Sequence, residues 1–289
     1  MNITIGKYQL ICGNIDFFSL NDYFNQKLKK IPDNIQSLIF CEFNQKLDNL
    51  PDSLQNLNLG WDFNQKLDNL PNDLQILIIG SEFNHKLENL PNNLRKLTLG
   101  NKFNQKLENL PNNLQELTLG WKFNQKLENL PNSLQSLTLD VCFNQKLKNL
   151  PNSLQSLTLG YSFNQKLKNL PKSLQSLTLG YSFNQKLENL PNSLQSLTLG
   201  GEFNQKLENL PSGLRYLTFN NNFNKKINIC LALPKLQILK FNNCYKGNIP
   251  IIFEIIIING HLTNKNQVKQ NYNFKEWKSI FYKSIKDLS

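Results

Sequence analysis

The chain has 289 residues and a formal net charge of +11, and hydrophobic residues make up 39% of it. Its longest apolar stretches, near residue 254, are far shorter than the roughly 20 residues of a membrane-spanning helix. Its first residues lack the basic start and apolar core of a secretory signal. The five cysteines form no CxxC pair, which argues against a zinc site or a disulfide framework. We therefore expect an intracellular protein without a membrane span.

The positive charge is concentrated near the C-terminus. Residues 43–222 hold 17 Lys/Arg and 14 Asp/Glu, whereas residues 223–289 hold 11 and 3. An excess of this size favours an anionic partner, such as nucleic acid or an acidic protein surface, but it carries no information about the fold.

Residues 1–23 are expected to form an N-terminal cap that contains a partial repeat. The stretch IDFFSL, from Ile15 to Leu20, aligns with the motif LQSLTL that recurs later in the chain. The cap therefore already includes a strand of the kind that the repeats predict.

A Phe-Asn dipeptide recurs at a fixed interval over most of the chain. It first occurs at Phe24 and last at Phe223, with a spacing of 19 residues once and 20 residues nine times. One unit of this length cannot bury an apolar face alone, but a stack of units can. The period therefore predicts a β-rich solenoid of about ten to eleven coils over residues 24–245.

One coil, residues 154–173, has the sequence LQSLTLGYSFNQKLKNLPKS. The alternation in its L-T-L segment predicts a strand between Leu154 and Leu159, with Leu157 and Leu159 facing inward and Thr158 outward. The proline that follows Asn-Leu in each coil lacks a backbone donor and fixes φ, so it is expected to end the ladder and set a turn.

A glycine follows the strand in most coils. Asp140 and Asn220 replace it in two coils, and Asn and Asp are the other residues that best tolerate a positive φ. The glycine column therefore predicts a left-handed corner. Cys41 breaks this pattern, so we expect the first corner to be built differently.

Three further columns are nearly identical from coil to coil. The phenylalanines predict an internal aromatic spine, and the asparagines beside them predict a hydrogen-bonded ladder that satisfies backbone groups. The lysines are followed two residues later by Asp or Glu, which predicts a solvated and neutralised charge ladder. Lys148 and Lys168 stand where the acidic residue is expected, with Lys172 nearby, and we predict a local basic patch there.

Positions that vary between coils are the candidates for partner binding. After the glycine corner, the variable pairs include the aromatic residues Trp61, Trp121, Tyr161 and Tyr181. Exposed aromatics anchor many interfaces, although single exposed aromatics are also ordinary surface features.

The outward positions of the strands vary too. Most of them are Ser or Thr, and they are flanked by Arg95 and Lys96 on one side and by Arg215 and Tyr216 on the other. We interpret this surface as a second candidate contact face.

Residues 246–289 are expected to form a basic C-terminal cap. The stretch IPIIFEIIIING predicts a strand that closes the stack, and a helix near the end would place Trp277, Ile280, Phe281, Ile285 and Leu288 on one face. Such a helix covers the exposed end of a solenoid; the alternative is an amphipathic helix that binds a membrane surface or a partner groove.

Residues that carry chemistry are sparse. His85 and His261 have no Cys, Asp or Glu at the spacing of a metal site or a catalytic triad, and there is no nucleotide-binding fingerprint. We therefore predict no catalytic residue, no metal, no cofactor and no enzyme activity.

The array resembles two related repeat families. The pattern LxxLxLxxxxxxxLxxLPxx is similar to leucine-rich repeats (LRRs). The tandem Phe-Asn-x-x-Leu and Leu-Pro-x-x-Leu units resemble more closely the FNIP repeats of amoebae and of giant viruses that infect amoebae. Here the motif is Phe-Asn-Gln-Lys instead of Phe-Asn-Ile-Pro. Relatives with an N-terminal F-box act as ubiquitin-ligase adaptors, but the stretch before Phe24 is too short for that helical domain, so we do not expect that role.

The sequence thus predicts a non-enzymatic scaffold that binds a protein partner through the solenoid surface. The alternative is electrostatic binding of nucleic acid or another anionic partner through the basic C-terminal region. We expect a monomer in the cytoplasm, which would be the host cytoplasm if the protein is viral.

Overall fold

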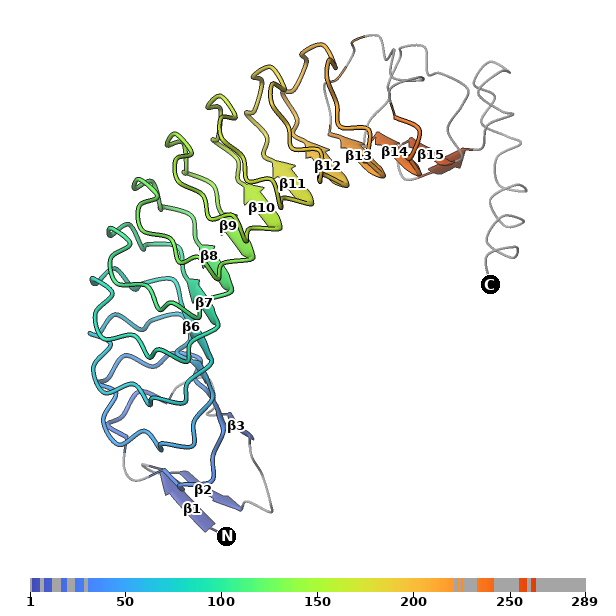
Figure 1. The fold of residues 1–289 in the computed structure, drawn as a ribbon. Coiled ribbons are helices and arrows are strands. Elements are labelled where there is room, and N and C mark those ends of the chain that lie inside the picture. The colour runs from blue at the N-terminus through green and yellow to red at the C-terminus, as the bar shows by residue number, and fades with distance from the viewer. Residues whose placement is uncertain are drawn as a thin grey trace. The chain divides into compact units, whose positions relative to one another are not determined.

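The computed structural model describes residues 2–5, 8–11, 17–19, 24–28, 31–220, 223, 225, 233–241, 255–258 and 261–263. The chain divides into two compact units, unit 1 (residues 1–154) and unit 2 (residues 155–289). Both contain regularly spaced parallel strands, as predicted for a solenoid (Figure 1). Neither contains a helix among the described residues.

Unit 1 contains an antiparallel strand pair and a parallel sheet. Strands β1 and β2 form the pair, and β3 to β9 form the sheet in chain order. Strand β3 lies within the stretch IDFFSL and pairs in parallel with β4. The strands are β1 (Asn2–Ile5), β2 (Tyr8–Ile11), β3 (Phe17–Ser19), β4 (Ser37–Ile39), β5 (Asn56–Asn58), β6 (Ile76–Ile79), β7 (Lys96–Leu99), β8 (Glu116–Leu119) and β9 (Ser136–Leu139).

Unit 2 continues the same pattern and ends on an antiparallel strand. Strands β10 to β15 pair in parallel, and β16 runs antiparallel to β15. The strand predicted in IPIIFEIIIING is confirmed as β15, whereas the predicted C-terminal helix lies outside the described residues. The strands are β10 (Ser156–Leu159), β11 (Ser176–Leu179), β12 (Ser196–Leu199), β13 (Tyr216–Phe219), β14 (Ile238–Phe241), β15 (Ile255–Ile258) and β16 (His261–Thr263).

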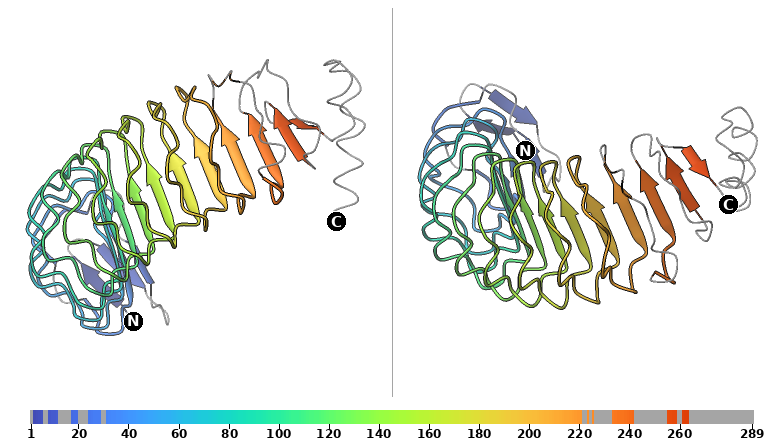
Figure 2. Two further views of the ribbon diagram at one scale, coloured as in Figure 1. Left: turned by 45° about the horizontal axis from the view of Figure 1, so that its top comes forward. Right: turned by 90° about the horizontal axis from the view of Figure 1, so that it is seen from above.

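Each strand buries one face, as its sequence predicts. In β10, Leu157 and Leu159 are buried and Thr158 is half-buried. Consecutive strands pair in register, so that Leu157 lies opposite Leu177 and Thr158 opposite Thr178. In each unit the strands lie side by side along one side of the coils, and the connecting segments form the rest (Figure 2).

The predicted aromatic spine is present. The Phe163 and Phe183 rings stack with centroids 6.2 Å apart and 7° between their planes, and both rings are fully buried. The same arrangement joins Phe63 to Phe83 at 6.2 Å in unit 1. Each coil thus buries one ring against the ring of the coil before it, together with the strand leucines.

The glycine column is not a left-handed corner, contrary to the prediction. Among the glycines whose corner geometry is described, only Gly60 has a positive φ, of 72°. The glycines are needed because the backbones approach closely. A Cβ atom at Gly80 would lie 1.7 Å from the carbonyl oxygen of Gly60, and one at Gly180 would lie 1.9 Å from that of Gly160. Steric exclusion of a side chain therefore accounts for this column. The corner at Gly60, one coil after Cys41, differs from the other glycine corners in its positive φ.

The left-handed conformation lies instead at the asparagine before Leu-Pro. Nine asparagines adopt a φ between 52° and 60°, and they are Asn49, Asn69, Asn89, Asn109, Asn129, Asn149, Asn169, Asn189 and Asn209. Asparagine is the residue other than glycine that most readily adopts this conformation. The sequence analysis missed this column.

The turn predicted at the proline column is confirmed. The amide of Leu134 donates to the carbonyl of Pro131 at 3.1 Å, and the equivalent bond joins Leu174 to Pro171. In the last described coil, the Leu236 amide donates to Leu233 at 3.2 Å, so a leucine takes the proline's place. This coil is modified, as the displaced Leu-Pro element predicts.

The asparagine ladder is also confirmed, and it includes glutamines that the sequence analysis missed. The Asn104 Oδ1 atom accepts from the Asn124 amide at 3.0 Å and from Gln125 Nε2 at 3.2 Å. His85 replaces glutamine in one coil, where its Nε2 lies 2.8 Å from the Asn64 carbonyl oxygen. One asparagine oxygen therefore serves two groups of the next coil.

Truncation of a spine ring is expected to destabilise the array strongly. Phe123→Ala removes a fully buried ring and should lower the free energy of unfolding by about 3–5 kcal/mol, measured by chemical denaturation. Trp61→Ala is the control, because Trp61 is 68% exposed, and it should change the value by no more than about 0.5 kcal/mol. Equal effects of the two changes would contradict the buried spine.

The glycine column and the column of asparagines with positive φ are expected to tolerate different substitutions. Gly100→Ala places a Cβ atom 2.2 Å from the Gly80 oxygen and should cost about 1–3 kcal/mol of unfolding free energy. The exposed Asn129 has a φ of 56°, so Asn129→Gly should be tolerated while Asn129→Ala costs about 1–2 kcal/mol. Denaturation of the three variants tests both assignments, and a tolerated Gly100→Ala would refute the close approach.

Candidate interaction surfaces

In unit 1, two tryptophans project from the corner that follows the strand. Trp61 and Trp121 are 68% and 53% exposed. Their backbones are fixed by bonds between coils: the Trp61 amide donates to the Cys41 carbonyl at 2.8 Å, and the Trp121 carbonyl accepts from the Cys142 amide at 2.9 Å. Large apolar rings therefore stand on a rigid backbone and face solvent, as predicted.

In unit 2, the predicted strip of two tyrosines forms at the same corner. The Tyr161 and Tyr181 rings stack with centroids 4.8 Å apart and 5° between their planes, and Tyr161 is 52% exposed. A Cβ atom at Gly201 would lie 2.5 Å from the Tyr181 ring. Glycine at this position of the next coil therefore leaves the space that the Tyr181 ring occupies.

The charged positions on the unit 1 sheet are partly paired. Lys96 Nζ lies 2.9 Å from Glu116 Oε2, across the β7–β8 register, while the neighbouring Arg95 is exposed. A second ion pair joins Lys102 to Glu82 in the corner column. The sequence analysis named Lys96 and Arg95 but missed both pairings, which join residues one coil apart.

The sheet face of unit 2 carries aligned hydroxyl groups. Ser156, Ser176 and Ser196 lie opposite one another in register, and Tyr216 of β13 continues their row. Tyr216 is 41% exposed, and Arg215 beside it is also exposed. The predicted polar face with a charged and aromatic border is therefore present within this unit.

The lysine column is exposed, but its acidic neighbours do not pair with it. Among residues 31–220, no ion pair within 4.0 Å joins a lysine of the Phe-Asn-x-Lys column to the acidic residue two positions later. Both side chains remain in solvent, as Lys186 and Glu188 do. The lysine column is solvated, as predicted. Its acidic neighbours can offset its charge only by electrostatic attraction over a longer distance, without a direct ion pair.

The two lysines that break the acidic column, and Lys172 nearby, are all exposed. Lys148 belongs to unit 1, and Lys168 and Lys172 belong to unit 2. The structure brings Lys168 and Lys172 to one open hollow of about 680 Å³, with Asn189 and Pro191 in its lining.

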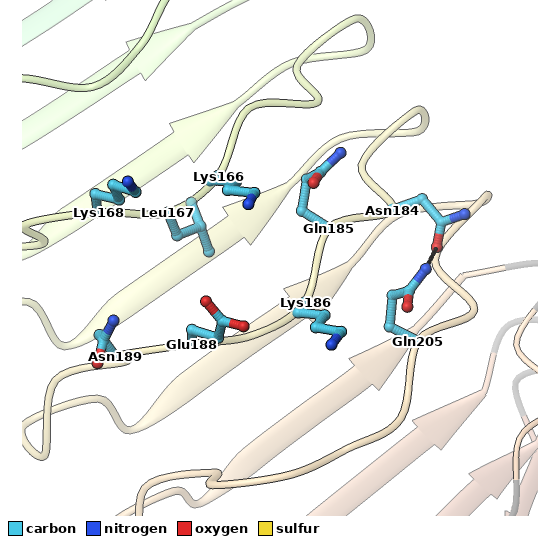
Figure 3. Close-up of a pocket in the computed structure, with 9 residues that line it drawn as sticks. All are labelled: Lys166, Leu167, Lys168, Asn184, Gln185, Lys186, Glu188, Asn189 and Gln205. Carbon is cyan, nitrogen blue, oxygen red and sulfur yellow. Dashed lines mark hydrogen bonds between the residues drawn. The ribbon is translucent and has the colours of Figure 1, made fainter.

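Lys168 also lines a neighbouring hollow of about 340 Å³, shown in Figure 3. Lys166, Lys186 and Glu188 line it as well, and Leu167 contributes an apolar wall. The lysines come from consecutive coils of the same unit. The sequence analysis missed Lys166 and Lys186 as parts of this site because each has the ordinary residue of its column.

Other kinds of site have little support in the described part of the chain. Among those residues, no three His, Cys, Asp or Glu side chains are grouped as a metal site requires, and no helix there is long and apolar enough to cross a membrane. His85 is a member of the ladder between coils.

The fold and the coil contacts define a class of protein, the LRR-like β-solenoids. Within that class, the sequence pattern of the FNIP Repeat matches residues 24–62, 43–82, 63–102, 103–142, 143–182, 163–202, 183–209 and 203–244. These matches cover well over half of the chain, and the chain belongs to the FNIP repeat family. No curated protein matches its sequence.

Several solved structures resemble the chain. CroV588, described as a novel circular LRR protein and derived from a giant virus, is 40% identical with a TM-score of 0.76, and the match covers 84% of this chain and 40% of CroV588. The chain therefore spans less than half of that protein. YopM from Yersinia enterocolitica is 21% identical with a TM-score of 0.47, over 80% of this chain and 61% of YopM.

The tyrosine stack predicts an energetic coupling between Tyr161 and Tyr181. In a double-mutant cycle with alanine at both positions, the coupling should be about 0.5–1.5 kcal/mol, measured from the free energies of unfolding. The matched control is the pair Trp61 and Trp121, which lie three coils apart and should be additive within about 0.5 kcal/mol. Additive tyrosine variants would show that the rings do not interact.

Proposed function

We propose that the protein is a non-enzymatic scaffold that binds a protein partner through the corner residues Trp61, Trp121, Tyr161 and Tyr181, here called the aromatic corner column. LRR-like repeats are typical of protein-interaction scaffolds. The exposure of these rings is the observation that carries the proposal. Three of the four are more than half exposed, although every spine ring is buried.

The chemistry of the aromatic corner column suits a protein partner. Aromatic side chains provide large contact areas with few rotatable bonds, which is why they dominate the energies of many interfaces. Here their backbones are fixed between coils, as by the bond from the Trp61 amide to Cys41. Little conformational freedom is lost when such a ring is buried by a partner.

Residues on the sheet face give a polar border to such an interface. In unit 1 this border contains Arg95 and the Lys96–Glu116 pair, and in unit 2 it contains Arg215 and Tyr216. Polar rims surround apolar anchors in most interfaces. A cytoplasmic monomer remains our expectation for the free protein.

Binding of nucleic acid through residues 223–289 stays a prediction. Most of these residues lie outside the described part of the chain. Lys225, Lys235 and Lys240 are described, the last two beside or on β14, and these three residues do not by themselves test binding by the whole region.

The proposal is tested by partner capture with a corner variant. Immobilised wild-type protein and the variant W121A/Y161A/Y181A are each incubated with lysate of the cells that make the protein, and the captured proteins are quantified by mass spectrometry. We expect a specific partner to fall at least tenfold with the variant, because each truncated anchor should cost about 1–2 kcal/mol of binding.

The matched control is S81A/N101A, which changes two polar residues at the equivalent corner positions of other coils in unit 1. It should capture the partner as the wild type does. Undiminished capture by the triple variant would refute the aromatic corner column as the binding surface.

A further inference from the structure

We infer that unit 2 carries a second binding surface, a lysine groove that takes an extended acidic peptide segment of the partner. The lysine groove is defined by the side chains Lys166, Lys168, Lys172, Lys186, Lys206 and Lys225. This inference rests on the proposed function, since it names the chemistry of a partner that the scaffold binds.

The groove is continuous over several coils. The hollow beside Lys168 shares Lys186, Glu188 and Gln205 with a third hollow of about 540 Å³. That third hollow extends to Lys206 and Lys225. On its other side, the first hollow shares Lys168 and Asn189 with the hollow that contains Lys172. Two hollows therefore follow each other along the stack, and the hollow with Lys172 adjoins the first between the same two coils, nearer the proline turn.

The groove has a strong positive excess. Six lysines line the three hollows, against only Glu188 and Glu208. In unit 1, from Lys46 onward, each lysine of this column has an acidic residue two positions later, except at Lys146. The excess in unit 2 arises where Lys168 replaces that acid and Lys172 is added. Exposed cations without ion-pair partners, such as Lys166 and Lys168, favour an anionic ligand.

The spacing of the coils matches an extended peptide. The spine rings three residues before the lysines repeat at 6.1–6.2 Å in unit 2, and we take this interval as the measure of the distance from one coil to the next. An extended chain places side chains of one face about 6.6 Å apart, at roughly 3.3 Å per residue. A segment with acidic residues at every second position can therefore present one carboxylate to each coil.

The lining of the groove favours a peptide over nucleic acid. Single-stranded nucleic acid binds through basic grooves that also offer aromatic side chains for base stacking. The residues that line the three hollows include Leu, Asn, Gln, Ser and Pro beside the charged side chains, and no aromatic residue. The exposed aromatic residues described in this unit, such as Tyr161 at the corner and Tyr216 on the sheet face, lie elsewhere. Walls such as Leu167 and Leu187 suit the apolar side chains of a peptide.

The test measures binding of a fluorescein-labelled peptide of alternating Glu and Ser, long enough to span the groove, by fluorescence anisotropy at low salt. We expect the full-length protein to bind it and to bind the Gln/Ser counterpart at least tenfold more weakly. K168E/K172E should weaken Glu/Ser binding about tenfold, because it restores an acidic residue in the column and removes two cations. E188Q/E208Q should strengthen binding severalfold, which an unfolded variant cannot do.

The matched control is K46E/K66E, which makes the same charge change at two exposed lysines of the Phe-Asn-x-Lys column in unit 1. It should change the affinity by no more than about twofold. An equal loss in K46E/K66E and K168E/K172E would reduce the effect to net charge and overturn the site. Tighter binding of a labelled single-stranded oligonucleotide than of the peptide would overturn the choice of ligand.

The two proposals fail independently. W121A/Y161A/Y181A should retain the peptide affinity, because it leaves the lysine groove intact. If capture of the partner depends on the corner but the wild type does not bind the peptide, the lysine groove is refuted and the proposed function stands. If the peptide binds as expected but capture is indifferent to the corner, the aromatic corner column is refuted.

Discussion

The close approach of backbones at the corner after each strand is the constraint on which the array depends. A Cβ atom at Gly200 would lie 1.7 Å from the Gly180 carbonyl oxygen, so coils can approach this closely only where no side chain intervenes. Asp140 and Asn220 replace glycine with a changed contact, in which their amides donate to Leu119 and Leu199 at 3.0 and 2.9 Å. The constant length of the repeat follows, because every coil must present its corner at the same place.

A fixed interval makes each buried column nearly uniform. The Phe183 ring has a phenylalanine before and after it, at 6.2 and 6.1 Å, and the Asn184 oxygen accepts from both Asn204 and Gln205 of the next coil. A change in one coil disturbs contacts with both neighbours. Exposed positions have no such restraint, which is why the residues that differ between coils are the ones that give each unit its surface chemistry.

Much of this structure could be predicted from the sequence, because equal columns imply equal contacts. The strand at Leu157 and Leu159, the phenylalanine spine and the asparagine ladder each follow from one residue type repeated at one interval. The glycine column was explained wrongly, since glycine satisfies both a positive φ and a close approach, and sequence alone does not separate these causes. The positive φ of asparagines such as Asn129 was missed for another reason. The proline two residues later already predicts a turn, so the asparagine was not considered separately.

The ion pairs were missed for a related reason. Lys96 and Glu116, and likewise Lys102 and Glu82, are separated by one full repeat, and in a stack that separation is the nearest neighbour. Opposite charges at one period are the signal that would have found them. Hollows such as that of Lys168 and Lys186 could not be predicted in this way, because they depend on how side chains of adjacent coils leave space between them.

The same reasoning explains why the acidic column can be interrupted in unit 2. Lys168 and Lys172 are exposed, and exposed ion pairs contribute only about 0–1 kcal/mol to stability, so the loss of an acidic residue there costs the fold little. The corresponding change at Phe163 or Gly180 would disturb buried contacts with adjacent coils. Such an array therefore tolerates substitutions that change its surface charge more readily than substitutions of the residues that join adjacent coils. Its binding specificity is expected to lie in the exposed columns.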